Sequence, residues 1–210
     1  MKLAELAQRP RAAPPPAPEE EVCELCGEPV EPEHRHVLDL HERRLLCACR
    51  ACTILFDRKG AGGGHFRLVP DECRLVDDFA LDDALWSRLR LPVEMAFFFH
   101  STPAGRTVAF YPSPLGATES LLELEAWKEL ESKNPVLASL EPDVEALLVN
   151  RTGERHEYWL VGVDRCYALV GLIKTRWKGL AGGQEVWDEL AAFFGALHAE
   201  AEVVTKEVAR

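Results

Sequence analysis

Cysteine is the residue type with the clearest chemistry in this chain. Five of the seven cysteines lie between residues 23 and 52, and four of them form two Cys-x-x-Cys pairs. Each pair makes a tight turn whose two sulfurs point the same way, and Gly27 suits the left-handed backbone that the first turn needs. Two such pairs, about twenty residues apart, can place four thiolates around one tetrahedral ion. The spacing therefore predicts a structural zinc site with the ligands Cys23, Cys26, Cys49 and Cys52.

Four further side chains near these pairs leave the ligand set open. Cys47 could replace one of the four thiolates or lie unliganded beside the site. His34, His36 and His41 could supply nitrogen ligands. The segment 36–46 alternates like the two strands of a ribbon hairpin, however, so we expect the histidines to point outward.

Zinc is favoured by the softness and the spacing of the thiolates, but other states of the cluster remain open. Four thiolates also suit an iron–sulfur or rubredoxin-like iron centre, and the thiols could carry no metal at all. A catalytic zinc is disfavoured because four thiolates close the coordination shell and leave no position for water.

No catalytic signature accompanies the cysteines. The motifs Gly-x-Ser-x-Gly, Ser-x-x-Lys and His-Glu-x-x-His do not occur. Nucleases of the His-Asn-His type also carry a histidine segment between two cysteine pairs, but the segment here has no Asn. Cys166 lies in an apolar stretch and is expected to be an inert core thiol. Cys73 lies among acidic residues that would raise its pKa, so we do not expect a nucleophile. The chain is predicted not to be an enzyme.

Charge and hydropathy restrict the partners. The formal net charge is −11, from 35 acidic and 24 basic residues, which opposes binding to a nucleic-acid backbone. No apolar run approaches the roughly 20 residues of a membrane span, and the N-terminus lacks the apolar core of a signal peptide. We therefore expect a cytoplasmic protein with no membrane contact. In that compartment clustered thiols bind metal more often than they form disulfides.

Composition divides the chain into three parts. Residues 1–21 are predicted to be a flexible Pro-rich leader. Residues 22–57 form a Cys-rich zinc-binding module, which is too short for a core of its own and would depend on metal for roughly 10 kcal/mol of folding free energy. A Gly-rich linker at 59–65 leads to the third part, an α+β domain over 66–202. The predicted fold class is therefore α+β, with a small zinc-ribbon-like module followed by an antiparallel-sheet domain covered by helices.

Local patterns place elements in this domain. Strands are predicted at 66–70, 93–99, 106–111, 144–149 and 157–163, and helices at 82–89, 120–131, 166–173 and 184–200. The strands at 93–99 and 106–111 form one hairpin, and those at 144–149 and 157–163 form a second. Asp82 and Asp164 are expected to cap the helices that follow them. The segment 112–116 reads as a turn-rich crossing. Four residues at helical spacing should form one buried face of the last helix: Trp187, Leu190, Phe194 and Leu197.

Several sequence segments in the α+β region resemble those of one protein family. They are Phe97–Phe99, Tyr111–Glu119, Asn134–Leu137, Glu141–Leu148, Cys166–Lys174 and Gly179–Gly183. They are similar to an uncharacterised bacterial family, known only as a domain of unknown function, which pairs a Cys-rich N-terminal module with such a body. Genes of that family tend to neighbour those of nickel–iron hydrogenases. The resemblance covers roughly residues 22–200 and implies a role in the assembly, maturation or association of a hydrogenase.

Two hypotheses of different classes follow. The first is a non-catalytic accessory protein that binds a protein partner, such as a hydrogenase subunit or a maturation factor. The second is a redox or metal-handling protein in which Cys47 makes the metal site labile. A nuclease is disfavoured by the net charge.

Overall fold

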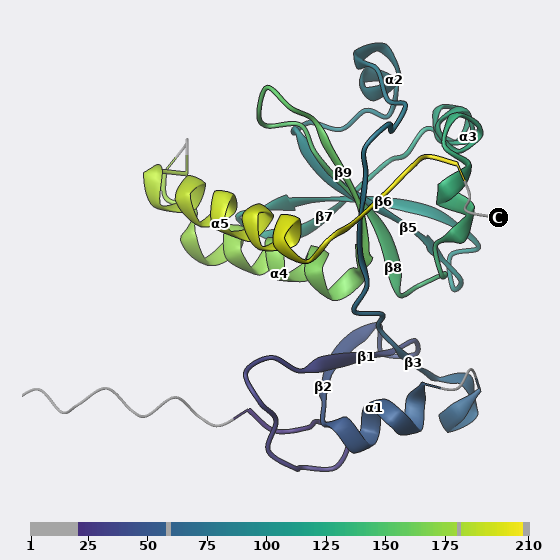
Figure 1. Ribbon diagram of the computed structural model, residues 1–210, viewed down its shortest axis with the longest axis vertical. Coiled ribbons are helices and arrows are strands. Elements are labelled where there is room, and N and C mark those ends of the chain that lie inside the picture. Colours follow the sequence, from purple (N-terminus) through teal and green to yellow (C-terminus); the bar gives the residue numbers. More distant parts are fainter. Residues whose placement is uncertain (1–20, 58–59, 180–181, 208–210) are drawn as a thin grey trace, which may run out of the picture.

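The computed structural model describes residues 21–57, 60–179 and 182–207. Their fold is mixed α/β, with two sheets and five α-helices (Figure 1). The predicted leader lies outside the described residues apart from Glu21.

The smaller sheet lies in the N-terminal part of the chain. It contains β1 (Arg35–Asp39), β2 (Arg44–Ala48) and β3 (Phe66–Leu68) in the order β2-β1-β3, with both pairs antiparallel. The ribbon hairpin predicted between the cysteine pairs is confirmed as β1 and β2. Helix α1 (Arg50–Phe56) and the short 3-10 helix η2 (Ala61–Gly64) complete this unit, which we call the N-terminal module, residues 21–57 and 60–68.

The strand predicted at 66–70 was expected in the larger domain, but it pairs with β1 instead. Phe66 and Leu68 pack against the core that contains the cysteines, together with Phe56 of α1. Apolar residues from outside the predicted range 22–57 therefore complete this small core.

The main sheet has seven strands in the order β10-β4-β9-β8-β5-β6-β7. These strands are β4 (Cys73–Val76), β5 (Met95–Ser101), β6 (Arg106–Ser113), β7 (Gly116–Ser120), β8 (Glu145–Asn150), β9 (Glu157–Gly162) and β10 (Glu202–Val204). Every neighbouring pair is antiparallel except β10 and β4, which are parallel. The sheet is therefore mixed, where the sequence predicted an antiparallel one.

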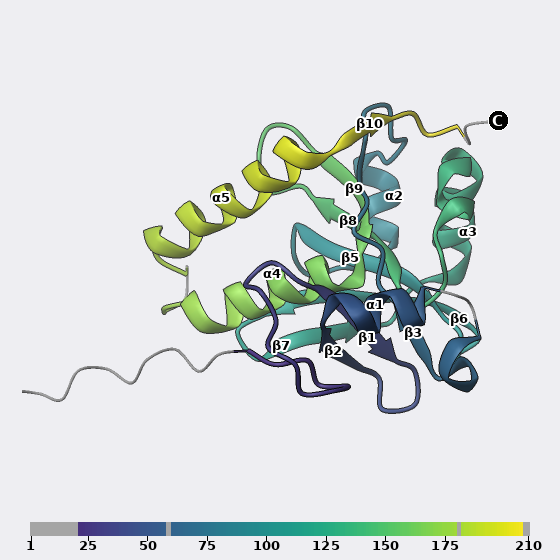
Figure 2. The ribbon, with the colours of Figure 1, turned by 60° about the horizontal axis from the view of Figure 1, so that its bottom comes forward.

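Helices cover both faces of the main sheet (Figure 2). On one face lie α4 (Val163–Arg176) and α5 (Gln184–Glu200); on the other lie α2 (Asp83–Arg88), α3 (Leu124–Lys133) and the 3-10 helix η3 (Pro135–Ser139). The sequence of strand β5 is continuously apolar because both of its faces are buried. Met95 and Phe97 join the core beneath α4 and α5, whereas Ala96 and Phe98 join the core beneath α2 and α3.

The two predicted hairpins are confirmed as β5–β6 and β8–β9, and the last helix has the predicted bounds 184–200. Its buried residues differ from the prediction at one position, because Val186 is fully buried whereas Trp187 is 40% exposed. The helix predicted at 120–131 begins only at Leu124, since residues 116–120 pair with β6 as strand β7. Of the segment 112–116, only residues 114–115 form the hairpin turn, because Pro112 and Ser113 end β6 and Gly116 begins β7.

The predicted caps have different outcomes. Asp82 caps α2 by accepting a hydrogen bond of 2.8 Å from the backbone N–H of Leu85. The prediction for Asp164 was wrong, because α4 begins at Val163 and its N-cap residue is Gly162. The Asp164 carboxylate instead accepts from the backbone N–H of Arg165 and contacts the His36 ring in the N-terminal module.

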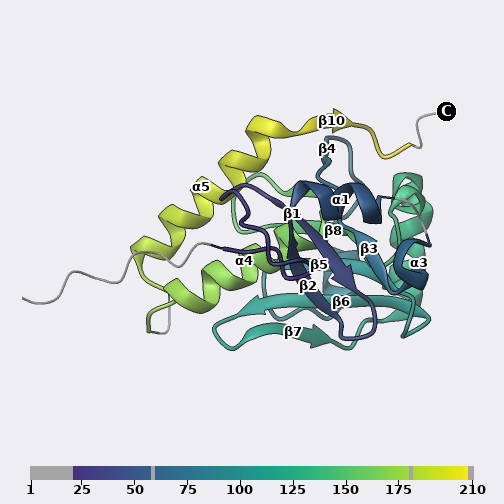
Figure 3. The same cartoon turned by 90° about the horizontal axis from the view of Figure 1, so that it is seen from below.

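The N-terminal module packs against the main sheet, as the view from below shows with β1, β2 and β3 in front (Figure 3). Leu38 and Leu45 reach the core beneath α4 and α5. Arg67 donates a hydrogen bond of 3.2 Å to the carbonyl of Pro142 and lies 4.0 Å from the Asp143 carboxylate. Among the described residues, no helix combines the length and the apolar character that a membrane crossing requires.

Candidate metal centre

The first cysteine pair lies in a tight turn. The backbone N–H of Gly27 donates to the carbonyl of Cys23 at 2.7 Å, and the N–H of Cys23 donates to the carbonyl of Glu28 at 2.7 Å. Gly27 has φ +80°, the left-handed conformation expected at this position. These bonds bring Cys23 and Cys26 onto the same side of the turn.

The second pair lies at the start of α1. Cys49 is the N-cap residue, and its carbonyl accepts a hydrogen bond of 2.9 Å from the N–H of Thr53. Cys52 follows three residues later, within the first turn of the helix. Residues three apart share a helix face, so the thiols of Cys49 and Cys52 lie on the same side of α1, the side of the Cys23–Cys26 turn.

Glu24 attaches the first turn to strand β2. Its backbone N–H donates to the carbonyl of Cys47 at 2.9 Å. Its carboxylate accepts from the N–H of Cys47 at 2.9 Å and from the Arg44 guanidinium at 2.7 Å. The two turns are therefore held in a fixed relation by residues that lie between the cysteine pairs.

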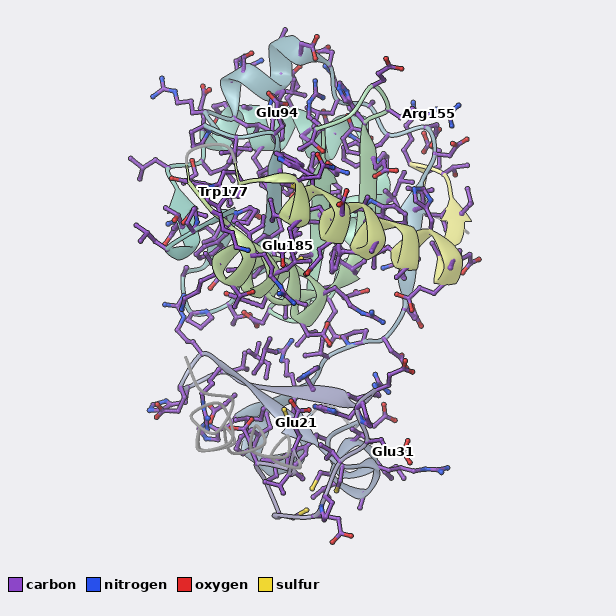
Figure 4. All side chains as sticks on the ribbon, turned by 90° about the vertical axis from the view of Figure 1, so that its left-hand side faces the viewer. Glu21, Glu31, Glu94, Arg155, Trp177 and Glu185 are labelled. Carbon is purple, nitrogen blue, oxygen red and sulfur yellow. The ribbon has the colours of Figure 1, made fainter. Side chains whose placement is uncertain are left out.

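The four predicted thiols meet. The sulfurs of Cys23, Cys26, Cys49 and Cys52 all lie within 4.8 Å of one another, and those of Cys26 and Cys49 are 3.6 Å apart. A tetrahedron with metal–sulfur bonds of about 2.3 Å has edges of about 3.8 Å, whereas a disulfide is only about 2 Å long. The spacing suits a shared ion. Figure 4 shows yellow sulfur atoms in the N-terminal module, in the lower part of the view.

The surroundings of the four sulfurs are mostly apolar. Cys23, Cys49 and Cys52 are buried, whereas Cys26 is exposed. Val37 of β1 and Ala48 of β2 are buried in the same small core. Water therefore has access to the cluster mainly on the side of Cys26.

The thiols of the cluster differ in acidity. Burial alone would raise the pKa of Cys23, but hydrogen bonds from the backbone of Cys49, Leu25 and Cys26 outweigh it and lower this pKa to about 6. Burial and the neighbouring sulfurs raise the pKa of Cys52. For Cys26, a backbone hydrogen bond from Glu28 lowers the pKa, but the thiols of Cys23 and Cys49 outweigh this effect, so the pKa is raised overall. The low pKa of Cys23 favours its thiolate, and a bound cation would supply the positive charge that the thiolates of Cys26 and Cys52 need. The cluster could hold a metal ion.

The four other side chains that the sequence offered as possible ligands lie outside the four-thiol cluster. His41 is exposed, as predicted. His34 and His36 do not join the four thiols and form a second group with Cys47, but their side chains are only 10% and 29% exposed rather than fully outward. The only sequence signal for that group was the His-x-His spacing on one face of a strand.

The two isolated cysteines match their predictions. Cys166 is completely buried within α4, as expected of a core thiol. The pKa of Cys73 is raised to about 11, chiefly by burial and secondarily by Glu200. The sequence-based prediction attributed the raised pKa to neighbouring acidic residues, but burial in β4 is the larger cause.

Fold and site together define a class: mixed α/β proteins whose N-terminal module carries a four-cysteine cluster able to hold a metal ion. The chain belongs to the Family of unknown function (DUF5947), whose model matches residues 22–201. The predicted resemblance to a domain of unknown function is thereby confirmed. No curated protein and no solved structure matches the chain.

Proposed function

We propose that this protein is a non-catalytic accessory protein with a structural zinc site, which acts in the assembly, maturation or association of a nickel–iron hydrogenase. The N-terminal module serves as a zinc-ribbon-like unit that contacts a protein partner in the cytoplasm. The observation that carries this proposal is the group of four converging sulfurs, because four protein ligands leave no coordination position for a substrate.

The choice of zinc is supported by the donor set. Four thiolates in a small, largely apolar core suit a borderline-soft ion with tetrahedral preference. The module has few buried apolar side chains of its own, so an ion at this position would stabilise its fold.

The choice of a protein partner is supported by two exposed apolar side chains beside the cluster. Ile54 and Leu55, which follow Cys52 in α1, are 68% and 62% exposed. Two neighbouring exposed apolar side chains offer apolar area that a protein partner could cover. The net charge of −11 favours a protein over a nucleic acid. The resemblance to a family whose genes neighbour those of nickel–iron hydrogenases supports a hydrogenase as this partner.

Co-purification tests the proposed partner. A tagged nickel–iron hydrogenase from the same organism should retain the full-length protein, and the double variant Ile54→Glu, Leu55→Glu should lose this retention while keeping its metal content. Leu121→Glu is the matched control, because Leu121 is 91% exposed outside the N-terminal module. Repeated recovery of the hydrogenase without this protein would contradict the proposal.

Elemental analysis tests the metal. Replacing Cys23, Cys26, Cys49 or Cys52 by Ser should remove one equivalent of zinc, because three thiolates hold the ion much less tightly than four. Cys166→Ser is the control, since Cys166 lies in α4 outside the cluster. Retention of the full metal content in all four cluster variants would exclude the site.

A redox or metal-handling role is the second candidate, and the exposure of Cys26 favours it. An exposed thiolate at a metal site can be oxidised or can exchange its ion. The absorption spectrum of anaerobically purified protein separates the two roles. A colourless protein supports zinc, whereas intense thiolate-to-iron absorption supports the redox role.

A further inference from the structure

A second group of metal-ligating side chains lies on the other face of the small sheet. One ring nitrogen of His34, one of His36 and the sulfur of Cys47 all lie within 4.8 Å of one another. His36 and Cys47 are directly opposite each other in the β1–β2 pairing, and His34 lies two residues before His36. Val37, the residue after His36, faces the four-cysteine core instead. Strand alternation thus separates this group from the four thiols.

His34 is held like a metal ligand. Its Nδ1 lies 2.7 Å from the carbonyl oxygen of Glu31. Because a carbonyl can only accept, Nδ1 carries the proton in this contact and Nε2 presents a lone pair. That Nε2 is buried and has no hydrogen-bond partner, in a side chain that is only 10% exposed. A buried nitrogen without a partner costs free energy, and a bound ion would remove that cost.

His36 is oriented in the same way by a residue of the main sheet unit. Its Nδ1 lies 3.0 Å from Oδ2 of Asp164, whose carboxylate is 18% exposed and also accepts from the N–H of Arg165. A carboxylate on one nitrogen of an imidazole leaves the other nitrogen as the ligand atom and raises its basicity. Asp164 therefore acts as the outer partner of His36.

We propose that His34, His36 and Cys47 form a second metal site that binds a divalent transition-metal ion, Zn²⁺ first among them. Two imidazole nitrogens and one thiolate suit zinc, cobalt or nickel ions and disfavour calcium or magnesium. Three protein ligands leave one coordination position open, so this ion exchanges more readily than the ion of the four-cysteine cluster. Because Asp164 belongs to α4, binding also links the N-terminal module to the main sheet. The inference does not depend on the proposed hydrogenase role.

Metal stoichiometry of the full chain is the first test. The metal-free protein is loaded with excess Zn²⁺, passed through gel filtration and analysed for zinc. We expect two equivalents in the unaltered chain and one in each of the variants His36→Ala and Cys47→Ser. His41→Ala is the matched control and should keep two, because His41 is an exposed histidine of the same module outside the group. A single equivalent in the unaltered chain, or two equivalents in both variants, would overturn the proposal.

A second variant addresses the outer partner without removing a ligand. Asp164→Asn should weaken the binding of the second equivalent by about 10- to 100-fold, as loss of a carboxylate partner of a histidine ligand does, and should leave the first unchanged. Competition with a chromophoric zinc chelator measures both affinities. Circular dichroism confirms that the variant is folded. Equal affinity in Asp164→Asn and the unaltered chain would contradict the assignment of Asp164.

The two metal sites are separable in the same assay. Cys26→Ser should lose the tight equivalent and keep the exchangeable one, whereas Cys47→Ser should do the reverse. If Cys26→Ser loses no zinc, the four-cysteine site fails. If Cys47→Ser loses none, the second site fails.

Discussion

Gly162 lies where β9 ends, α4 begins and the N-terminal module approaches the main sheet. A Cβ at this position would be 2.5 Å from the carbonyl oxygen of Pro70, 2.6 Å from Oδ1 of Asp164 and 2.8 Å from Cγ1 of Val69. Two of these neighbours are parts of the chain that leaves the N-terminal module. The absence of a side chain therefore permits close contact between the two sheets.

Gly162→Ala is expected to lower the free energy of unfolding by about 1 to 3 kcal/mol, because the backbone of Pro70 must shift to admit a methyl group. Urea denaturation measures the change. Gly153→Ala is the control, since its nearest contact would be an ordinary 3.8 Å to the carbonyl oxygen of Arg155. Equal stability of the two variants would contradict the close contact.

The candidate ligands show what residue types and spacing can predict. Cys23, Cys26, Cys49 and Cys52 were identified because each pair is brought together by a local turn. The orientation of His36 was not predictable, because its partner Asp164 lies 128 residues away in the chain. Local patterns also assigned Asp164 a capping role, since an acidic residue near a helix start is usually explained that way.

Helix α3 shows how one buried polar residue can connect elements. Asn134, at the C-terminal end of α3, is completely buried. Its Oδ1 accepts from the N–H of Ala80 at 2.7 Å, and its Nδ2 donates to the carbonyls of Ala80 at 3.1 Å and Leu130 at 2.9 Å. The end of α3 is thereby attached to the segment before α2.

Asn134→Ala should destabilise the protein by about 1 to 3 kcal/mol, because it leaves the half-buried backbone N–H and carbonyl of Ala80 without these partners. Thermal and urea unfolding check this value. Ser132→Ala, a change of an exposed residue in the same helix, should stay within about 0.5 kcal/mol of the unaltered protein. A comparable loss in both variants would show that the effect belongs to the helix rather than to the Asn134 contacts.

Elements with strong local patterns were predictable, and short strands with distant partners were not. Helix α5 and both hairpins follow from periodicity and turn residues over contiguous sequence. Strands β4 and β10 are four and three residues long, and their pairing is determined by packing rather than by their own sequence. Strand β3 was found, but nothing local specified which sheet it would join.

At the scale of the whole molecule, the described residues are organised around three apolar cores of unequal size. The main sheet has one on each face, whereas the N-terminal module has a small core that includes three of the four cluster cysteines, Cys23, Cys49 and Cys52. The stability of the two parts should therefore respond differently to loss of metal.

Removing metal with a strong chelator should increase hydrogen exchange throughout residues 21–57 and 60–68 and leave β5, β8 and β9 protected. The reason is that the main sheet retains both of its cores, whereas the module loses the ion that links its two cysteine turns. Hydrogen exchange followed by mass spectrometry measures this. Restoring Zn²⁺ should reverse the change. Unchanged exchange in the module would show that it folds without an ion.

The position of strand β4 in the chain has a consequence for folding during synthesis on the ribosome. Both of its neighbours in the sheet come much later in the chain, β9 some 80 residues further on and β10 later still. At ordinary translation speeds of roughly 5 to 20 residues per second, β4 waits for several seconds with its backbone edges and the thiol of Cys73 uncovered. A newly made chain therefore passes through an interval in which a chaperone could bind this strand and an oxidant could reach a sulfur that the finished protein buries.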